Sequence, residues 1–388
     1  MTTIAPTTAD LRETLRRLAE TEHLELPILS VYLDVRPEAT GQSPGRRVSF
    51  TVLRDRLREI EATYWPRGAD YDSFVADRDR IEAFLDDELD PATQGVALFA
   101  CSAIGLWEVI QAGVPFRDSV AAGPRPDLFQ LARLIDEHRT AVIAVVDSNT
   151  ARLFVSRSGA IEERDGPDEG TESFRKREVG GWSQARYQRH IDKHIADFAA
   201  TAAAEIERLV EREAADRLVL AGDEVAIGPL TDALSQAVRR KVTDVARIGI
   251  RATKDEIDAE VRPILDRFEG DEGSELADRV VGLVRGNGLA VAGVRATRSM
   301  LEAGAVDTLV MVGLPGDPPE QSAGHDARSL QDRDEIAEEA EDRPLDLEAR
   351  NDLVRLATLT AAAVEVVATH PALEHAGGVG ALLRYRPD

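Results

Sequence analysis

The feature that most limits how this chain can fold is a repeated alternation of short apolar runs with longer amphipathic segments. Runs at 95–103, 141–147 and 217–221 have the length and composition of buried strands. Between such runs, apolar residues recur every three or four positions, as they do along one face of a helix. Alternating strands and helices are typical of α/β domains. The sequence therefore predicts an α/β fold.

Glycine and proline clusters predict where the chain divides. Residues 123–126 contain two prolines and a glycine, which stop both helix and strand, and residues 270–273 begin and end with glycine. The 388 residues of the chain are also too many for one ordinary core. We expect three domains at residues 1–125, 138–270 and 274–388, the last with an acidic insertion at 316–350.

The longest amphipathic pattern lies in the second expected domain. Apolar residues from Tyr187 to Leu209 recur at spacings of three or four and predict a helix from Gln184 to about Arg212. At ~1.5 Å per residue, such a helix is roughly 40 Å long. Other expected helices are 229–240, 254–268, 274–285, 289–303 and 353–369, and other expected strands are 246–250, 308–312 and 379–385.

Composition excludes several classes of function. Cys101 is the single cysteine, so the chain cannot build an internal disulfide, an iron–sulfur cluster or a thiolate zinc site. No apolar run approaches the roughly 18 residues that a membrane span needs. The N-terminus lacks the basic start and apolar core of a secretory signal. These features predict a cytoplasmic protein with no cofactor, no metal and no membrane partner.

The net charge of −24 argues against RNA binding by the whole surface, but the charge is unevenly distributed. Residues 316–350 carry 12 acidic residues against four arginines, as a solvated loop or an extra helix would. Residues 173–194 instead carry six basic residues against two acidic ones. The six are Arg175, Lys176, Arg177, Arg186, Arg189 and Lys193. This segment is the strongest candidate for contact with phosphate groups.

The same basic segment contains a glycine pair, Gly180 and Gly181, followed by Trp182, Ser183 and Gln184. Paired glycines let another molecule approach the backbone closely. The plainest alternative is a surface turn whose Ser183 or Gln184 caps the following helix. A second alternative is the nucleophile elbow of a serine hydrolase, although the residues before Ser183 are too charged for the strand that an elbow requires.

A metal site is a further alternative for this segment. His190 and His194 are four residues apart on the expected helix, a spacing that can hold one metal ion. A third strong ligand is not evident, so a solvated basic face explains the two histidines more simply.

At the glycine pair the chain begins to resemble a known family. The segment Gly180–His190 resembles the catalytic loop of the bacterial and archaeal relatives of eukaryotic class-I peptide release factors. That group includes Vms1-type peptidyl-tRNA hydrolases and Pelota-like proteins. The ending Gly377–Tyr385 is similar to the C-terminal strand of those release factors. Both motifs occur in the family's order, within a layout that covers nearly all 388 residues.

The resemblance implies a role for each domain. The first would face the decoding region of the ribosome. The central domain would be RNase H-like and would present the glycine loop at the peptidyl-transferase centre. The third would be L7Ae-like and would contact factors or the ribosome. The first domain lacks the family's Asn-Ile-Lys-Ser signature for reading stop codons, so the resemblance implies rescue of stalled ribosomes rather than ordinary termination.

The resemblance also implies roles for the residues of the loop. Gly180 and Gly181 would admit the acceptor end of a tRNA, and Gln184, in a polar pair with Ser183, would orient the water that attacks the peptidyl ester. In the family the glutamine directly follows the glycines, whereas two residues intervene here. The six basic residues would clamp phosphates. In a second chemistry, a ribose 2′-hydroxyl attacks a phosphate near the CCA end, and His190 is the candidate acid or base.

The leading hypothesis is thus a ribosome-associated peptidyl-tRNA hydrolase or rescue factor that acts without a stop codon. A non-catalytic hibernation factor that occupies the tRNA A site of idle ribosomes is the main alternative, and a hydrolase of small esters is a third. The expected partners are the ribosome and peptidyl-tRNA, with a translational GTPase as a further candidate.

Overall fold

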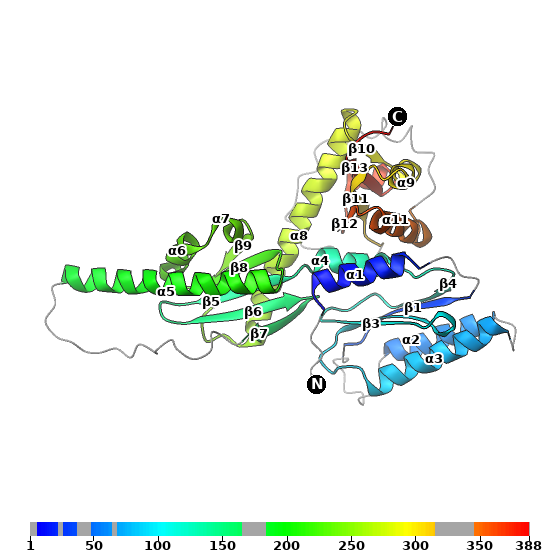
Figure 1. Cartoon of the computed structure of the whole chain (residues 1–388), viewed down its shortest axis with the longest axis horizontal. Helices are drawn as coiled ribbons and strands as arrows, with labels where there is room; N and C mark the ends of the chain where they lie inside the picture. Colours follow the sequence, from blue (N-terminus) through cyan, green and yellow to red (C-terminus); the bar gives the residue numbers. More distant parts are fainter. Residues whose placement is uncertain are drawn as a thin grey trace. The chain divides into compact units, whose positions relative to one another are not determined.

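A computed structural model of the chain describes residues 6–21, 26–36, 48–63, 68–164, 184–314 and 345–387. Its residues fall into two compact units. Unit 1 combines Met1–Glu137 with Glu269–Asp388, and unit 2 is His138–Phe268. Three sheets with helices on their faces confirm the predicted α/β class (Figure 1). The division of the chain into domains 1–125, 138–270 and 274–388 stays a prediction.

Unit 2 is built on one five-stranded sheet. Its elements are β5 (Ala141–Val146), β6 (Ala151–Arg157), β7 (Ala160–Arg164), α5 (Gln184–Arg212), β8 (Arg217–Gly222), α6 (Glu224–Ala233), α7 (Gln236–Arg239), β9 (Val242–Ala246) and the start of α8 (Lys254–Arg285). The strand order is β7-β6-β5-β8-β9. β5, β8 and β9 are parallel neighbours, whereas β6 is antiparallel to both β5 and β7.

Helices cover both faces of this sheet, which explains why β5 is apolar throughout. Alternate β5 residues such as Val142 and Ala144 pack with α5, α6 and α7 on one face. Ile143 and Val145 pack with the first part of α8 on the other face. A strand that is buried on both sides shows a continuous apolar run instead of an alternating one. All six residues of β5 are buried accordingly.

The N-terminal part of unit 1 holds a four-stranded antiparallel sheet of order β3-β2-β1-β4. Its elements are α1 (Thr8–Ala19), β1 (Ile28–Asp34), α2 (Val48–Glu61), α3 (Ala69–Asp87), β2 (Gly95–Cys101), the 3₁₀ turn η1 (Ser102–Ile104), β3 (Leu106–Ala112), β4 (Ser119–Gly123) and α4 (Phe129–Glu137). Helices α2 and α3 pack on one face, while α1 and α4 pack on the other.

The C-terminal part of unit 1 holds a second four-stranded sheet, of order β10-β13-β11-β12. Its elements are the end of α8, β10 (Ala290–Ala292), α9 (Val294–Glu302), β11 (Val306–Val312), α11 (Leu347–Leu359), β12 (Ala363–Val367), α12 (Pro371–His375) and β13 (Val379–Leu383). Only β11 and β12 pair in parallel. The α8 segment covers one face, and α9 and α11 cover the other.

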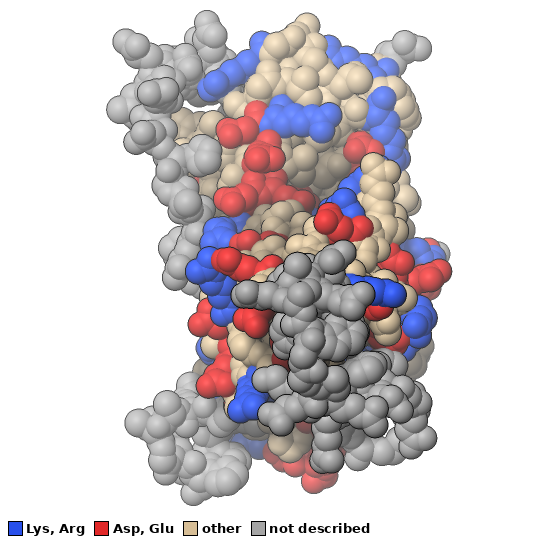
Figure 2. All heavy atoms as spheres, turned by 90° about the vertical axis from the view of Figure 1, so that its left-hand side faces the viewer, with Lys and Arg blue, Asp and Glu red and all other residues tan. Residues whose placement is uncertain are grey.

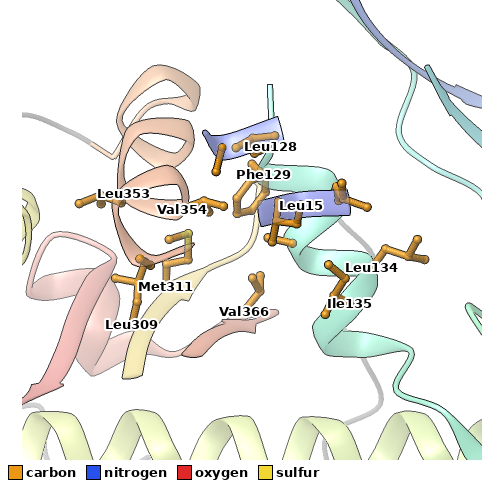
Figure 3. Close-up of a cluster of buried hydrophobic side chains, with 14 of the residues drawn as sticks. Leu15, Leu128, Phe129, Leu134, Ile135, Leu309, Met311, Leu353, Val354 and Val366 are labelled. Carbon is orange, nitrogen blue, oxygen red and sulfur yellow. The ribbon is translucent and has the colours of Figure 1, made fainter. Parts of the chain in front are cut away.

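The two parts of unit 1 share one hydrophobic core. Figure 3 shows side chains from α1 and α4 beside side chains from α11 and the C-terminal sheet. The drawn residues include Leu15, Phe129, Met311, Val354 and Val366. Backbone groups are tied across the same contact. The Asn351 side-chain oxygen accepts hydrogen bonds from the N–H groups of Leu128 and Phe129 at 3.1 and 2.9 Å.

The predicted helix from Gln184 to Arg212 is confirmed as α5. The predicted break at residues 270–273 is wrong for the helix, because α8 continues from Lys254 to Arg285. A Cβ atom at Gly273 would lie 2.8 Å from Cγ1 of Val367. The glycine therefore allows α8 to pack closely on β12 and does not form a turn.

Two other predicted helices each contain a strand. The expected helix 289–303 is β10 followed by α9, and the expected helix 353–369 is the end of α11 followed by β12. Gly293 at φ 89° and Ala361 at φ 53° reverse the chain between helix and strand. The expected helix 229–240 is α6 and α7, and the expected strand 246–250 lies earlier, at β9. Among the described helices, none is long and apolar enough to cross a membrane.

Candidate functional site

Two elements of unit 2 frame the predicted glycine loop. β7 ends at Arg164 and α5 begins at Gln184. The predicted loop residues Gly180, Gly181 and Ser183 lie between these elements, outside the described residues. The same holds for three of the predicted phosphate contacts, Arg175, Lys176 and Arg177.

Gln184 is the first residue of α5, so its backbone is helical. The first N–H groups of a helix have no partner within the helix, and the aligned peptide dipoles give this end a partial positive charge. The positive end of α5 therefore directly follows Gly180, Gly181 and Ser183 in the chain. An oxyanion or phosphate near Gln184 would be stabilised by this end of the helix.

The remaining predicted site residues lie in the first three turns of α5. Arg186, Arg189, His190 and Lys193 occur at spacings of three, four and seven residues, which places them along one face of the helix. Lys193 is exposed, and the side chains of the other three are not described. The helix thus brings four predicted residues into one row that starts beside Gln184.

This row lies on a part of α5 that extends beyond the sheet. Among the described side chains of α5, the first buried one is Ile195. From Phe198 to Val210 the helix packs on the core that includes residues of β5 and β8. In Figure 1 the N-terminal part of α5 projects past the ends of the strands. At ~1.5 Å per residue, Gln184 lies roughly 15 Å beyond the buried part of the helix.

A buried ion pair fixes the other end of α5. Glu213, directly after the helix, bonds to Arg157 at the end of β6, and both residues are buried. Arg164 and Arg212 lie 3.9 and 3.5 Å from the same carboxylate. Burial favours a higher pKa for Glu213, but the three arginines together hold its pKa below the ordinary value. The carboxylate therefore stays ionised at neutral pH and anchors α5 to the sheet.

A second arginine clamp was not apparent from the sequence. Arg152 on β6 donates hydrogen bonds to the carbonyls of Ile250 and Ala252 at 3.1 and 2.6 Å. It also pairs with Glu163 at 2.7 Å. The clamp holds the segment between β9 and α8 against the sheet. The two carbonyl groups that Arg152 binds lie about 100 residues away in the chain, so no local pattern indicates the clamp.

The carboxyl edge of the parallel strands is where ligands usually bind in α/β sheets. Asp147 follows β5 at this edge, but its carboxylate accepts hydrogen bonds from the N–H groups of Asn149 and Thr150 and so closes the turn to β6. Within the ranges that the structure describes, no group of three or more His, Cys, Asp or Glu residues is arranged to hold a metal.

Charges are mixed on the face that Figure 2 views, where Lys and Arg side chains are interspersed with Asp and Glu side chains. A face of this kind does not attract RNA over a wide area.

A comparison with protein families finds one match, which covers most of unit 2 and the end of the preceding segment. Residues 126–265 match the family "Bacterial archaeo-eukaryotic release factor family 10". Over these residues the chain is similar to release-factor-like proteins. The matched residues contain β5–β9, the glycine loop and α5, so the release-factor likeness lies where the sequence placed the site. No curated protein matches the chain.

Solved structures of translation factors are also similar to the chain. An archaeal translation termination factor is 18% identical over 99% of this chain and 100% of its own, with a TM-score of 0.25. Pelota from Archaeoglobus fulgidus is 16% identical over 99% and 94%, with a TM-score of 0.33. Dom34 from S. cerevisiae, a translation termination-like factor, is 11% identical over 76% and 80%, with a TM-score of 0.39. All three TM-scores are below 0.5.

Proposed function

We propose that this release-factor-like chain binds stalled ribosomes and frees the nascent peptide from peptidyl-tRNA without reading a stop codon. The observation that carries the proposal is the family match over unit 2, which contains the Gly180–Gln184 loop and the projecting part of α5. A loop at the end of a narrow helix can enter a confined RNA site that the body of unit 2 cannot enter.

The chemistry needs few protein groups. A peptidyl ester is already activated, so a positioned water and dipoles that stabilise the oxyanion are sufficient. Gln184 would orient the water, with the glycine pair admitting the acceptor end. The positive end of α5 would stabilise the developing negative charge. Arg186, Arg189 and Lys193, together with Arg175, Lys176 and Arg177, would hold tRNA phosphates.

One observation favours a second function. Gln184 lies within α5, so its backbone has the fixed geometry of a helix rather than that of a glycine loop. A glutamine held in this way is less free to reach an ester. The second candidate is therefore a non-catalytic hibernation factor, in which the loop and α5 occupy the tRNA A site of idle ribosomes.

The test uses purified ribosome–nascent chain complexes that are stalled on a labelled peptidyl-tRNA. The peptide and the tRNA 3′ end are analysed after incubation with the protein. Free peptide with intact tRNA indicates ester hydrolysis, and tRNA shortened by its CCA end indicates nuclease action with His190 as the candidate acid or base. Ribosome binding without either product would contradict the hydrolase proposal and favour the hibernation factor.

Two glutamine variants sharpen this test. Gln184→Ala should reduce peptide release at least about 100-fold, the usual effect of losing a group that acts on the transition state, with ribosome binding unchanged. Gln188→Ala is the matched control, because Gln188 lies one turn later on the same helix. Equal release by both variants would show that Gln184 does not orient the water.

We also propose the domain roles and partners that the family resemblance implies. Unit 2 would be the RNase H-like domain, which its sheet with helices on both faces supports. Residues 1–125 would face the decoding region. Residues 274–388 would be the L7Ae-like domain and the place where a translational GTPase binds. Cross-linking of the full chain to ribosomes, followed by identification of the ribosomal component that each part of the chain contacts, tests these roles.

A further inference from the structure

Three arginines from separate segments of unit 1 gather around one carboxylate, Asp352 on α11. Arg125, in the loop before α4, lies 3.6 Å from this carboxylate, and Arg298 on α9 lies 3.5 Å from it. Arg355 follows one turn later on α11. Arg298 also pairs with Glu302 at 3.0 Å. Among the described residues, the three guanidinium groups of this cluster thus accompany two carboxylates, Asp352 and Glu302, which leaves a net positive charge in a chain of net charge −24.

Arg355 is the member of this cluster that has no hydrogen-bond or ion-pair partner in the described part of the chain. Its Nε atom is buried and makes no hydrogen bond, and among the described residues its side chain forms no ion pair. Burial, followed by the neighbouring charge of Arg125, lowers the pKa of Arg355, and Asp352 offsets this only in part. An unpaired, partly buried charge costs folding free energy. A bound anion would offset this cost by pairing with the Arg355 guanidinium group.

The surroundings add to the positive potential. Asn351, next to Asp352, accepts hydrogen bonds from the first N–H groups of α4, so the positive end of that helix lies beside the cluster. The site is also accessible, because the Arg125 and Arg298 side chains are 39% and 51% exposed. An exposed group of arginines on a firm core is suited to a ligand that approaches from outside.

We propose that Arg125, Arg298 and Arg355 form a phosphate-binding site whose ligand is a backbone phosphate of RNA. Guanidinium groups donate paired hydrogen bonds that match the oxygens of phosphate. The open position of the site favours a phosphate on the surface of a large polymer over an enclosed small ligand. The choice of RNA rests on the proposed ribosomal function, whereas the anion site itself does not.

RNA binding provides the first test. A fluorescein-labelled oligouridylate is titrated with the full chain at several KCl concentrations, and its anisotropy is measured. Arg355→Gln should weaken binding several-fold and reduce the slope of log K against log salt by about 0.7, as expected when one phosphate contact to a single strand is lost. Arg56→Gln, which removes an exposed arginine of α2 that pairs with Glu59, is the control. An equal loss in both variants would overturn the proposal.

Stability without RNA provides the second test, because a structural arginine and a ligand-binding arginine differ there. Arg355→Gln should leave the melting temperature unchanged or raise it, since it removes an unpaired charge. Inorganic phosphate at constant ionic strength should raise the melting temperature of the wild type more than that of the variant. A lower melting temperature for the variant, with both binding properties unchanged, would make Arg355 structural and refute the site.

The remaining outcomes separate the source of the phosphate from the proposed function. If phosphate stabilises the wild type but RNA binds wild type and variant equally, the ligand is a small phosphate compound and the RNA proposal is wrong. Neither measurement involves peptide release. A failure of the hydrolase proposal would therefore appear only in the ribosome assay, and a failure of this site only here.

Discussion

Asp127 is a carboxylate folded into the core of unit 1, where it is 6% exposed. One of its carboxylate oxygens accepts a hydrogen bond from the N–H of Phe129 at 3.3 Å. Its backbone carbonyl accepts the hydroxyl of Tyr32 at 2.7 Å. Burial is the main cause that raises the pKa of Asp127 above its ordinary value. The folded protein therefore keeps a proton at a pH where the unfolded chain has already released it.

This proton makes stability depend on pH in a direction that can be tested. A raised pKa contributes stability that is complete below the ordinary pKa of aspartate and is lost as the pH rises through the folded-state value. Asp127→Asn mimics the protonated form and removes this loss. The variant should match the wild type near pH 4 and become the more stable protein towards pH 8, as measured by urea unfolding. A difference that stays constant over this range would contradict the raised pKa.

At the residue scale the sequence indicates local sites well and distant pairs poorly. The basic row on α5 can be predicted, because Arg186, Arg189 and Lys193 share a spacing that any helix turns into a face. The ion pair of Arg157 with Glu213 joins residues 56 positions apart, and no local spacing encodes it. The cluster around Asp352 has the same origin, since three separate segments meet there.

At the scale of elements, the junction of β5 and β8 depends on one glycine. Gly222 ends β8 at φ +133°, and a Cβ atom there would lie 1.8 Å from the carbonyl oxygen of Val146. Gly222→Ala should lower the free energy of unfolding by at least about 3 kcal/mol, through backbone strain and a clash that cannot relax. Thermal or urea unfolding of the full chain measures this.

Gly282 provides the control for this prediction. It lies in the helix α8, is exposed, and has no atom within 4 Å of an added Cβ. Gly282→Ala should therefore stabilise the protein by roughly 0.5–1 kcal/mol, because alanine loses less backbone entropy in a helix. Similar destabilisation by both substitutions would mean that the approach of Gly222 to β5 is not what matters.

The elements that sequence patterns predict well are those with one uninterrupted period. α5 is such an element, since it packs along a single sheet face from Phe198 to Val210. Apolar periodicity fails where a helix leads directly into a strand. Ala361 ends α11 with a positive φ but carries no glycine signal, so the apolar residues of β12 look like a continuation of the helix. Gly273 causes the opposite error. Glycine is common both in turns and where a helix packs closely on a strand, so the sequence predicts a break where α8 in fact continues.

At the scale of the whole chain, unit 1 is assembled from two distant segments. The α1 and α4 face of the N-terminal sheet is covered by residues of α11, β11 and β12. The Val366 N–H also donates to the buried Asp136 carboxylate at 2.6 Å. A fragment that ends at Glu137 should consequently expose this apolar face, bind a hydrophobic dye and unfold without a sharp transition.

Co-expression completes that experiment. When residues 1–137 are produced together with residues 269–388, the two fragments should associate and unfold cooperatively with little dye binding. Residues 138–268 have two cores of their own, so this fragment should fold alone. Cooperative unfolding of 1–137 in isolation would show that the shared core contributes little to its stability.

Because unit 1 consists of two distant segments, its shared core can form during synthesis only after the second segment has been made. The first segment leaves the translating ribosome before the strands that cover it have been made. At about 5–20 residues per second, the roughly 230 residues from the end of this segment to the end of β12 take about 10 to 50 s to make. During that interval unit 2 can already fold, while the apolar face of the first segment depends on chaperones or on its own solubility.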